Sequence, residues 1–382
     1  MKSLIFVLPN LQGGGAERVV LNVIRGLDKG KFKPILFLIK NEGVYWSEVP
    51  PNINVVTVLN SGQNVILNIV TVIWKLLVVA RKADIIIGSL ELTATYLAVI
   101  VGVILRKPSV GWVHTDMRLN QPNANKKIHS KLVQWLYPYL SLIICVSTGV
   151  ADGICELLPC ITGRTKVIYN PLYTEEIIRQ SNEPLDYNFP NNVILAVGRL
   201  RWEKGFDLLI RAHEKLIKAD VKHTLIILGE GKERVAIEKL IYELHMEDTI
   251  ILPGFQQNPY KWLKAANAFV LSSRCEGLSM VLLEAMILGT PVISFNCPSG
   301  PAEILENGRY GLLVPRDDID ALAAAMKNIL KQRDVASKLS RLGKERAQQF
   351  STNNIISKFE EAFINVKRVK IIEMGESIRC QT

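Results

Sequence analysis

Short runs of apolar residues alternate along the first half of the chain with longer segments whose apolar residues recur every three or four positions. The short runs predict β-strands and the longer segments predict helices. Such alternation predicts a parallel sheet with helices on both faces, and continuous apolar runs such as 85–87 are typical of strands buried on both sides. We expect strands at 3–8, 34–39, 53–58, 84–88, 109–113, 141–146 and 166–169, and helices near 16–27, 64–81, 92–104, 127–138 and 148–157.

The stretch from Tyr169 to Asn192 interrupts this pattern, because it is more polar and contains three prolines. Such composition between periodic segments favours a loop, so we expect a linker at 171–190. The alternation then resumes. We expect strands at 193–198, 223–229, 249–252, 268–271, 291–294 and 311–314, and helices at 206–217, 232–245, 279–288, 319–331, 334–348 and 353–372.

The whole pattern predicts an α/β protein with two doubly wound, Rossmann-like domains, and a length of 382 residues fits two domains. The first domain would span 1–170 and the second 191–350. A C-terminal helix within 351–382 would pack back toward the first domain. Doubly wound sheets bind ligands beyond the carboxyl ends of their strands, so we expect two such edges to face each other across a cleft.

Three apolar segments are candidates for membrane insertion. The start of the chain, MKSLIFVLPN, has an apolar run too short for a secretory signal and typical of a first strand. Residues 65–80 include polar side chains, and residues 92–105 fall short of the ~18 apolar residues that a membrane span needs. We expect buried helices for both segments and no transmembrane span.

The excess of basic over acidic residues is concentrated in the first half of the chain. The chain has 46 Lys and Arg against 36 Asp and Glu; residues 1–170 hold 18 basic and 9 acidic side chains, a net of +9, and residues 171–382 have a net of +1. A basic half attracts nucleic acid, an anionic membrane or a phosphorylated ligand. No nucleic-acid-binding motif is visible, so we expect no nucleic-acid partner. The six cysteines lack the spacing of a zinc site and suit a reducing compartment.

The loop after the first predicted strand is rich in glycine. Gly13, Gly14 and Gly15 open onto a helix, where glycine lets backbone amides approach a phosphate and the helix N-terminus adds partial positive charge. The loop is not a dinucleotide fingerprint, which would need glycine at Arg18, and no Gly-Lys-Ser/Thr follows. A plain tight turn explains the glycines equally well.

A second loop, GRLRWEKG at 198–205, follows the first strand of the second domain. Arg199 and Lys204 lie at its two ends. A diphosphate leaving group gains negative charge as its bond breaks, and two cations with backbone amides can stabilise it without a metal. The alternative is a pair of solvated loop charges.

A third segment, SSRCEGLSMVLLEAMILGTPVIS at 272–294, contains two carboxylates. Glu276 lies in a loop, and Glu284 lies in the apolar helix that follows. The N-terminus of this helix can face a phosphate. A carboxylate within an apolar run needs a hydrogen-bonding partner, and ribose hydroxyls would be suitable donors. The alternative is a Glu284 that reaches solvent at the helix edge.

These motifs in this order resemble the signature of glycosyltransferase family 4, whose members have the GT-B fold. GRLRWEKG and EGLSMVLLE carry the resemblance, while GGGAERV at 13–19 and CPSGPAEIL at 297–305 resemble bacterial enzymes that assemble lipid-linked oligosaccharides and surface polysaccharides. The resemblance covers nearly the whole chain. It implies a retaining, metal-independent glycosyltransferase that needs no cofactor, because the nucleotide sugar is a co-substrate.

The resemblance also implies a role for each motif. Arg199 and Lys204 would bind the donor diphosphate, and the glycine loop would approach it from the first domain. Glu276 would accept hydrogen bonds from hydroxyls of the donor sugar, and Glu284 from the ribose. The donor-binding candidates are Gly14, Gly15, Arg199, Lys204, Glu276, Met280, Val281 and Glu284.

His114 ends the strand in VGWVHTDMR, where its side chain would point toward the ligand. A histidine at this position can hydrogen-bond a sugar hydroxyl and help to place the reacting carbon, a role that the resemblance supports. The catalytic candidates are His114, Glu276, Arg199 and Lys204.

The acceptor side has its own candidates. Asp116 would either meet the acceptor hydroxyl or cap its loop. The segment that follows, to residue 139, mixes basic and aromatic residues, which suggests contact with an anionic membrane surface. A solvated helix with its aromatic residues in the core explains the pattern equally well. The acceptor-side candidates are Asp116, Arg118, Lys126 and Lys127, and we expect a cytoplasmic protein, peripheral on the inner face of the cell membrane.

Asp318 and Asp320 form an Asp-x-Asp pattern that binds a metal in another glycosyltransferase fold. Here the pattern precedes a predicted helix, and acidic residues favour caps and first turns of helices. We therefore expect a helix cap and no metal site. The remaining histidines, at 129, 213, 223 and 245, are expected in surface contexts without a function.

The sequence thus predicts transfer of a hexose or N-acetylhexosamine from a UDP-sugar to a glycan acceptor linked to a polyprenyl diphosphate. One alternative is a sugar-nucleotide 2-epimerase of the same fold, which would need further carboxylates and histidines. Another is a non-catalytic protein that binds anionic surfaces, which leaves the loop motifs unexplained. A glycoside hydrolase needs paired carboxylates on either side of the bond, whereas Glu276 and Glu284 are assigned to one donor.

Overall fold

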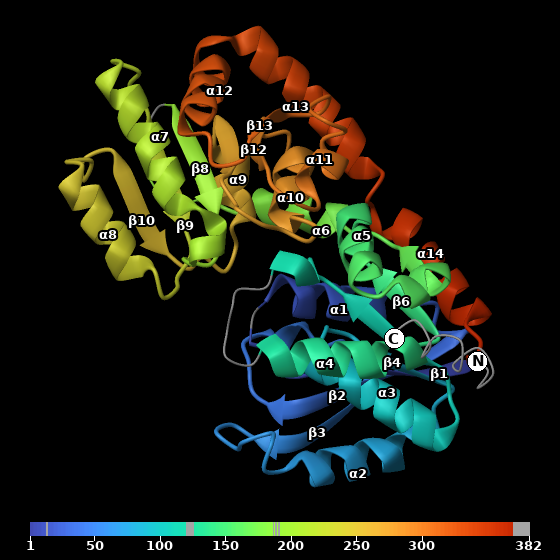
Figure 1. Cartoon of the computed structure of the whole chain (residues 1–382). Helices are drawn as coiled ribbons and strands as arrows, with labels where there is room; N and C mark the ends of the chain where they lie inside the picture. The colour runs from blue at the N-terminus through green and yellow to red at the C-terminus, as the bar shows by residue number, and fades with distance from the viewer. Residues whose placement is uncertain (13, 120–125, 186, 188, 190–191, 370–382) are drawn as a thin grey trace. The chain divides into compact units, whose positions relative to one another are not determined.

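The computed structural model describes residues 1–12, 14–119, 126–185, 187, 189 and 192–369. The chain divides into two compact units. Unit 1 combines Met1–Pro171 with the chain from Thr352 onward, and unit 2 is Leu172–Ser351. Each unit contains a parallel sheet covered by helices, so the predicted α/β class with two Rossmann-like domains is confirmed (Figure 1).

The sheet of unit 1 has the strand order β3-β2-β1-β4-β5-β6-β7, and neighbouring strands are parallel. The order reverses direction between β1 and β4, so the carboxyl ends of these two strands form a topological switch point. The strands are β1 (Lys2–Leu8), β2 (Phe32–Asn41), β3 (Asn54–Asn60), β4 (Ile85–Gly88), β5 (Ser109–Val113), β6 (Leu142–Cys145) and β7 (Thr165–Val167).

Alternate residues of β1 face opposite sides of this sheet. Ile5 and Val7 belong to the core shared with helices α2 and α3, while the ring of Phe6 contacts Phe363 on the other side. The helices of unit 1 are α1 (Gly15–Gly26), α2 (Ile69–Ala80), α3 (Thr93–Leu105), α4 (Lys126–Leu136), α5 (Thr148–Leu157) and α14 (Thr352–Asn365), with 3₁₀ turns η1 (Tyr45–Glu48), η2 (Met117–Leu119), η3 (Tyr137–Tyr139) and η4 (Pro159–Arg164).

Helix α14 belongs to unit 1 although it follows unit 2 in the sequence (Figure 1). The Lys2 ammonium donates to the carbonyl of Phe363 (3.1 Å) and to that of Ile364 (2.8 Å), which satisfies carbonyls of the last helical turn. The Phe363 ring lies 6.0 Å from Phe6 and 6.4 Å from Phe32, centroid to centroid. The C-terminal helix is thus an integral part of the core beside β1 and β2.

The sheet of unit 2 has the order β10-β9-β8-β11-β12-β13, again parallel, with its switch point between β8 and β11. Its strands are β8 (Val193–Val197), β9 (Thr224–Leu228), β10 (Ile250–Gly254), β11 (Ala268–Leu271), β12 (Val292–Asn296) and β13 (Leu312–Pro315). Its helices are α6 (Thr174–Ser181), α7 (Phe206–Lys218), α8 (Arg234–Glu243), α9 (Tyr260–Ala265), α10 (Met280–Leu288), α11 (Pro301–Ile304), α12 (Ile319–Lys331) and α13 (Arg333–Gln348), with the 3₁₀ turn η5 (Trp202–Lys204).

Two expectations about these elements need correction. The segment expected as a linker holds helix α6, whose Ile177 and Ser181 are buried; α6 packs against α9 and α10. The apolar segment at 65–80, expected as a buried helix, buries only one face, because Val70 and Trp74 of α2 are exposed. No helix within the described ranges is long and apolar enough to cross a membrane.

Candidate functional site

The switch point of unit 2 brings together the loops that follow β8 and β11. Gly205, which ends η5 and begins α7, adopts φ +61°, a left-handed conformation that favours glycine. A Cβ atom at this position would lie only 2.1 Å from the carbonyl oxygen of Ser272. The Ser272 hydroxyl in turn donates to the carbonyl of Lys204 at 2.9 Å. The two loops therefore approach so closely that glycine is required between them.

This approach joins two of the sequence candidates in an ion pair. The Lys204 ammonium donates to Oε1 of Glu276 at 2.6 Å. The hydroxyl of Ser273 donates to the same oxygen, also at 2.6 Å. The Lys204 side chain is 26% exposed and that of Glu276 is 10% exposed, so both can reach a ligand while solvent screens their attraction only in part.

Arg274 fixes the geometry of these loops, and the sequence analysis did not identify it. Its guanidinium makes two hydrogen bonds to the carboxylate of Asp207, at 2.8 and 2.6 Å, and one to the carbonyl of Trp202 at 2.8 Å. It also lies 4.8 Å from the centre of the Trp202 ring. The hydrogen bonds that Arg274 donates to the Asp207 carboxylate raise the pKa of Arg274 above its usual value. The sequence offered one signal for its role, because Arg274 is a positive residue only two positions before the candidate Glu276.

The N-terminus of α10 lies in the same region. Ser279 is the N-cap residue, and its side chain does not accept a bond from the helix. Among the described residues, its buried hydroxyl is one of the few side-chain polar atoms without a partner. Gly300 (φ +92°) approaches the backbone of Gly277, with 2.9 Å between its would-be Cβ and the carbonyl oxygen. A helix N-terminus with an unpaired buried hydroxyl is suited to bind an anion.

The other sequence candidates of unit 2 lie around this region. Arg199 is exposed directly after the strand β8 and Gly198, and Met280 and Val281 form the half-buried first turn of α10. Glu284 is half-buried in the second turn of that helix. The structure therefore places these residues on the elements at the switch point.

The switch point of unit 1 carries the glycine loop. Gly14 is the N-cap residue of α1 and has no side chain with which to cap the helix, but the Glu17 carboxylate lies against it, with 2.1 Å between Glu17 Oε2 and a would-be Cβ on Gly14. A Cβ on Gly15 would meet no atom within 4 Å, so its surroundings are open. Gly13 lies outside the described residues. The helix therefore begins at the exposed Gly15, with the Glu17 carboxylate beside its first turn.

His114 is buried at the end of β5, beside the same edge of the sheet. Its Nε2 lies 3.1 Å from the carbonyl oxygen of Ser89, and burial lowers the pKa of the imidazole to about 3. A neutral ring must donate from Nε2 to that carbonyl, which leaves Nδ1 as an acceptor. The Trp112 ring packs against the imidazole, with centroids 4.9 Å apart.

Glu91, which the sequence analysis missed, holds the backbone around His114. Its carboxylate accepts hydrogen bonds from the amide of His114 at 3.1 Å and from the hydroxyl of Thr115 at 2.8 Å. Glu91 follows β4, so its position after a buried strand was the signal that could have identified it. Glu91 therefore fixes the backbone at the carboxyl end of β5, directly at His114.

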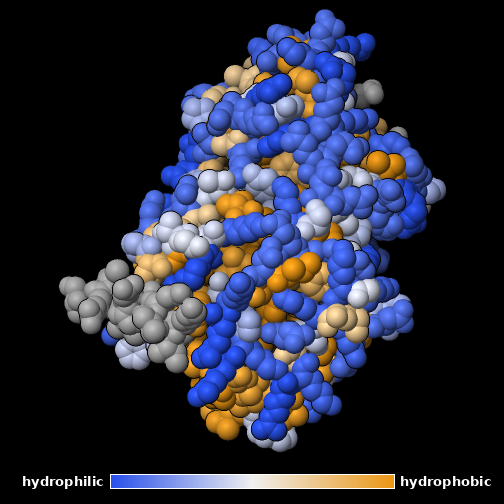
Figure 2. Space-filling model, turned by 90° about the vertical axis from the view of Figure 1, so that its right-hand side faces the viewer, coloured by the Kyte–Doolittle hydropathy of each residue, from blue (hydrophilic) through white to orange (hydrophobic). Residues whose placement is uncertain are grey.

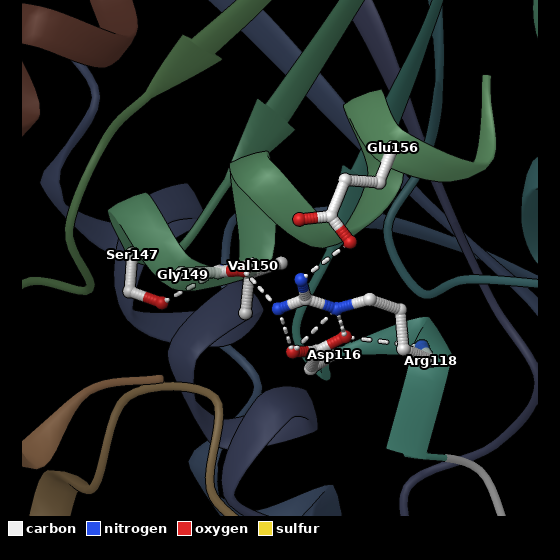
Figure 3. A network of polar contacts seen from close by, with 6 residues as sticks. All are labelled: Asp116, Arg118, Ser147, Gly149, Val150 and Glu156. Carbon is white, nitrogen blue, oxygen red and sulfur yellow. Dashed lines mark hydrogen bonds and ion pairs between the residues drawn. The ribbon is translucent and has the colours of Figure 1, made fainter. Parts of the chain in front are cut away.

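Two of the acceptor-side candidates, Asp116 and Arg118, form an ion pair with each other (Figure 3). The Asp116 carboxylate accepts from the Arg118 guanidinium, with the shortest contact at 2.6 Å, and from the Arg118 amide at 3.0 Å. Arg118 also donates to Glu156 of α5 at 2.8 Å. A Cβ on Gly153 of α5 would lie 2.5 Å from Asp116 Oδ1, so the carboxylate is packed against that helix.

Asp116 therefore caps its own loop, which was one of its two expected roles. Lys127 is exposed on α4. Lys126 begins α4, but its side chain lies outside the described residues.

His213 and His223 were expected at the surface, and this expectation is wrong. Both are buried in unit 2, away from the loops above, and His213 Nδ1 lies 2.8 Å from His223 Nε2. His213 Nε2 lies 2.9 Å from the Thr249 hydroxyl, and His223 Nδ1 lies 2.8 Å from the carbonyl of Val221. The two facing ring nitrogens share a single hydrogen, so both rings cannot be protonated at once, and burial lowers the pKa of both.

Comparisons with known proteins agree with this architecture. Residues 13–176 match the family model described as Glycosyltransferase Family 4, and residues 175–347 match the model described as Glycosyl transferases group 1. A glycosyltransferase of Haemophilus influenzae is 24% identical over 370 residues, which cover 94% of this chain and 99% of that protein.

A second relative carries a more specific name. The N-acetylgalactosamine-N,N'-diacetylbacillosaminyl-diphospho-undecaprenol 4-alpha-N-acetylgalactosaminyltransferase of Campylobacter jejuni is 32% identical over 228 residues, 60% of this chain and 61% of that protein. The match therefore spans less than two thirds of that relative.

The crystal structure of Anabaena HepE in complex with UDP and glucose has the same fold. It superposes with a TM-score of 0.80 at 20% identity and covers 96% of this chain and 100% of that chain. The two family models follow one another along the sequence, and each unit contains a parallel sheet of the Rossmann type. The chain therefore belongs to the glycosyltransferases of the GT-B fold, with a Family 4 domain followed by a group 1 domain.

Proposed function

We propose that this glycosyltransferase transfers a hexose or N-acetylhexosamine from a UDP-sugar to a lipid-linked glycan acceptor, with retention of anomeric configuration, in the assembly of cell-surface glycans. The observation that carries the donor assignment is the group at the switch point of unit 2: Lys204 bonded to Glu276, beside the unpaired Ser279 hydroxyl and the uncapped start of α10. Cations and a helix N-terminus at one sheet edge suit a diphosphate.

Lys204 would stabilise the diphosphate as it leaves. A lysine ammonium has three donors, and the bond to Glu276 uses one of them, so the others remain for phosphate oxygens. Arg199, the α10 amides and the Ser279 hydroxyl would contribute further donors. Negative charge that develops on the leaving group is best stabilised by donors that are already in position, and this supply of positive charge makes the reaction independent of a metal.

Glu276 would bind hydroxyls of the donor sugar. Its Oε1 already accepts from Lys204 and Ser273, while a carboxylate has further acceptor sites for sugar hydroxyls. Glu284, one turn into α10, would accept from the ribose. The carboxylates would thus orient the two ends of the donor on either side of its diphosphate.

His114 would bind a sugar hydroxyl without exchanging a proton. Because its Nε2 faces the Ser89 carbonyl and its pKa is about 3, the imidazole is neutral and presents Nδ1 as an acceptor. Glu91 holds the backbone at this point, so the ring position is determined before a ligand binds.

The relatives support the choice of substrates. HepE binds UDP and glucose, and the name of the Campylobacter jejuni protein specifies a diphospho-undecaprenol acceptor. A lipid-linked acceptor also agrees with the excess of basic residues in 1–170 and with a peripheral location on the cytoplasmic face of a membrane.

A panel of sugar nucleotides tests the proposal directly. We expect UDP and one or more UDP-sugars to raise the melting temperature, because a ligand at 100 times its Kd adds about 2.7 kcal/mol of stability. The same UDP-sugar should support transfer to a polyprenyl-diphosphate-linked glycan, and nuclear magnetic resonance should show the donor's anomeric configuration in the product. If no nucleotide stabilises the protein and no sugar is transferred, the proposal is wrong.

A further inference from the structure

Helix α2 has an exposed apolar face. On one side, Val72, Leu76 and Ala80 are buried against the sheet. The opposite side follows a four-residue spacing that begins just before the helix. Its large apolar residues Ile66, Leu67, Val70, Trp74 and Val78 are exposed by 81, 85, 77, 62 and 42%, respectively. A helix that is apolar on all sides is normally buried on all sides, so this face lacks a partner within its own unit.

The C-terminal end of α3 extends this face. Helices α2 and α3 pack on the same side of the sheet of unit 1. The Lys107 ammonium, just after α3, donates to the carbonyls of Ala80, Arg81 and Ala83 and so ties the ends of the two helices together. We define the α2–α3 apolar face as Ile66, Leu67, Val70, Trp74, Val78, Val103 and Ile104, all exposed.

Cations accompany the α2–α3 apolar face. Arg81, Lys82 and Arg106 are exposed at the ends of α2 and α3. In the sequence, no Asp or Glu occurs between Glu48 and Asp84, and this segment contains the whole of α2. In Figure 2, orange apolar side chains gather at the lower end of the view, with blue hydrophilic side chains among and beside them.

Exposed apolar residues with cations beside them indicate which kind of partner this face binds. Large exposed apolar patches mark interaction surfaces, and apolar residues with Trp beside Lys and Arg are typical of surfaces that lie in the interface of anionic membranes. A second copy of the chain is a poorer fit, because an isologous dimer through this face would gather the cations of both copies. A soluble protein partner would need a matching acidic rim.

We propose that the α2–α3 apolar face docks unit 1 onto an anionic lipid bilayer, with Trp74 inserted at the level of the headgroups. This inference rests on the proposed function, since a lipid-linked acceptor would lie in that bilayer. It differs from the expectation that the basic segment around α4 makes the contact. Contact through α2 is parallel to the membrane surface, because a helix of 12 residues is too short to span it.

Vesicle binding tests the surface with a matched pair of substitutions. Trp74 on α2 and Trp135 on α4 are 62% and 70% exposed in the same unit, so Trp74→Glu and Trp135→Glu make the same change on the competing surfaces. We expect the full-length protein to sediment with phosphatidylglycerol vesicles, less with phosphatidylcholine, and less in high salt. Trp74→Glu should weaken this binding about tenfold or more, and Trp135→Glu should leave it unchanged.

Several results would overturn the proposal. They are unchanged vesicle binding by both Trp74→Glu and Val70→Glu, loss of binding by Trp135→Glu alone, and a mass by light scattering that shows a dimer broken by Trp74→Glu. Thermal melting checks that each variant is folded, since both side chains are exposed. Failure of the proposed function is distinguished by UDP stabilisation and by transfer to a water-soluble acceptor, because Trp74→Glu should preserve both.

Discussion

The two sheets carry different chemistry at the same topological position. At the switch point of unit 2, the cation of Lys204 pairs with the carboxylate of Glu276, and the start of α10 is uncapped. At the corresponding edge of unit 1, the buried His114 is neutral, and the charge of Glu91 is directed at backbone and hydroxyl donors rather than at a cation. One edge is therefore suited to a ligand whose charge changes, and the other to a ligand that must be positioned.

The strongest test of this comparison removes the charge from unit 2. Lys204→Ala should lower turnover about 100-fold or more, because it removes a donor that would stabilise the leaving diphosphate. Turnover is measured with saturating UDP-sugar. The control is Lys215→Ala, since Lys215 is also an ion-paired lysine of unit 2 but bonds Asp320 at the surface. Wild-type turnover in the Lys204 variant, with the fold intact, would contradict the assignment.

A second test compares the glycines of the two loops. Gly205→Ala should destabilise unit 2 by about 2 kcal/mol or more, because a left-handed alanine is strained and its Cβ would overlap the Ser272 carbonyl. Gly15→Ala in unit 1 should change stability by less than about 1 kcal/mol, because the added methyl meets no atom within 4 Å. Urea unfolding measures both, and equal losses would show that the two loops are not differently constrained.

Acidification offers a third test, because each unit buries neutral histidine. Burial lowers the pKa of His213 in unit 2 and of His114 in unit 1 to about 3, below the unfolded value of 6.5. Below pH 6.5 the unfolded chain therefore binds more protons than the folded chain, and stability falls as the pH falls toward 3. For one such histidine the loss at pH 5 is about 2 kcal/mol.

Unit 2 should lose more stability than unit 1 in this range, because His223, whose pKa is also lowered, adds to the effect of His213. His213→Gln should reduce the slope of stability against pH, even if it lowers stability at pH 7.5. Hydrogen exchange resolved by segment separates the two units, and an unchanged slope in the variant would exclude the histidine pair as the cause.

The sequence predicted the two sheets well, because continuous apolar strands and amphipathic helices are local patterns. It also identified Lys204 and Glu276 but not their ion pair, which forms only when loops 72 residues apart meet at the switch point. Arg274 was missed for the same reason, since its partner Asp207 lies in the first turn of α7, 67 residues earlier in the chain. Contacts between loops depend on strand order, which local patterns do not encode.

The errors have physical causes as well. His213 shares the buried face of α7 with Leu209 and Leu216, so helical spacing could have placed it in the core. Helix α6 lies in a polar stretch bounded by prolines, where its short amphipathic pattern was taken for a linker. The apolar composition of α2 predicted a fully buried helix, whereas one of its faces is exposed. The sequence alone does not distinguish an apolar face that packs inside the protein from one that forms an interaction surface.

The smallest expected effect concerns metal removal. Excess EDTA should leave turnover unchanged, because the proposed donor site supplies its own positive charge from Lys204, Arg199 and the start of α10. Both carboxylates of the Asp-x-Asp pattern already have partners within the protein. Asp318 accepts a bond from the Ala321 amide at 2.9 Å as the N-cap of α12, and Asp320 pairs with Lys215. If EDTA abolishes turnover and Mn²⁺ or Mg²⁺ restores it, a metal must neutralise the diphosphate, and the contrast between a charged unit 2 site and a neutral unit 1 site would need revision.

Asp318→Asn then separates the possibilities, since asparagine retains the cap but weakens a metal site; unchanged metal dependence in that variant would place the ion elsewhere.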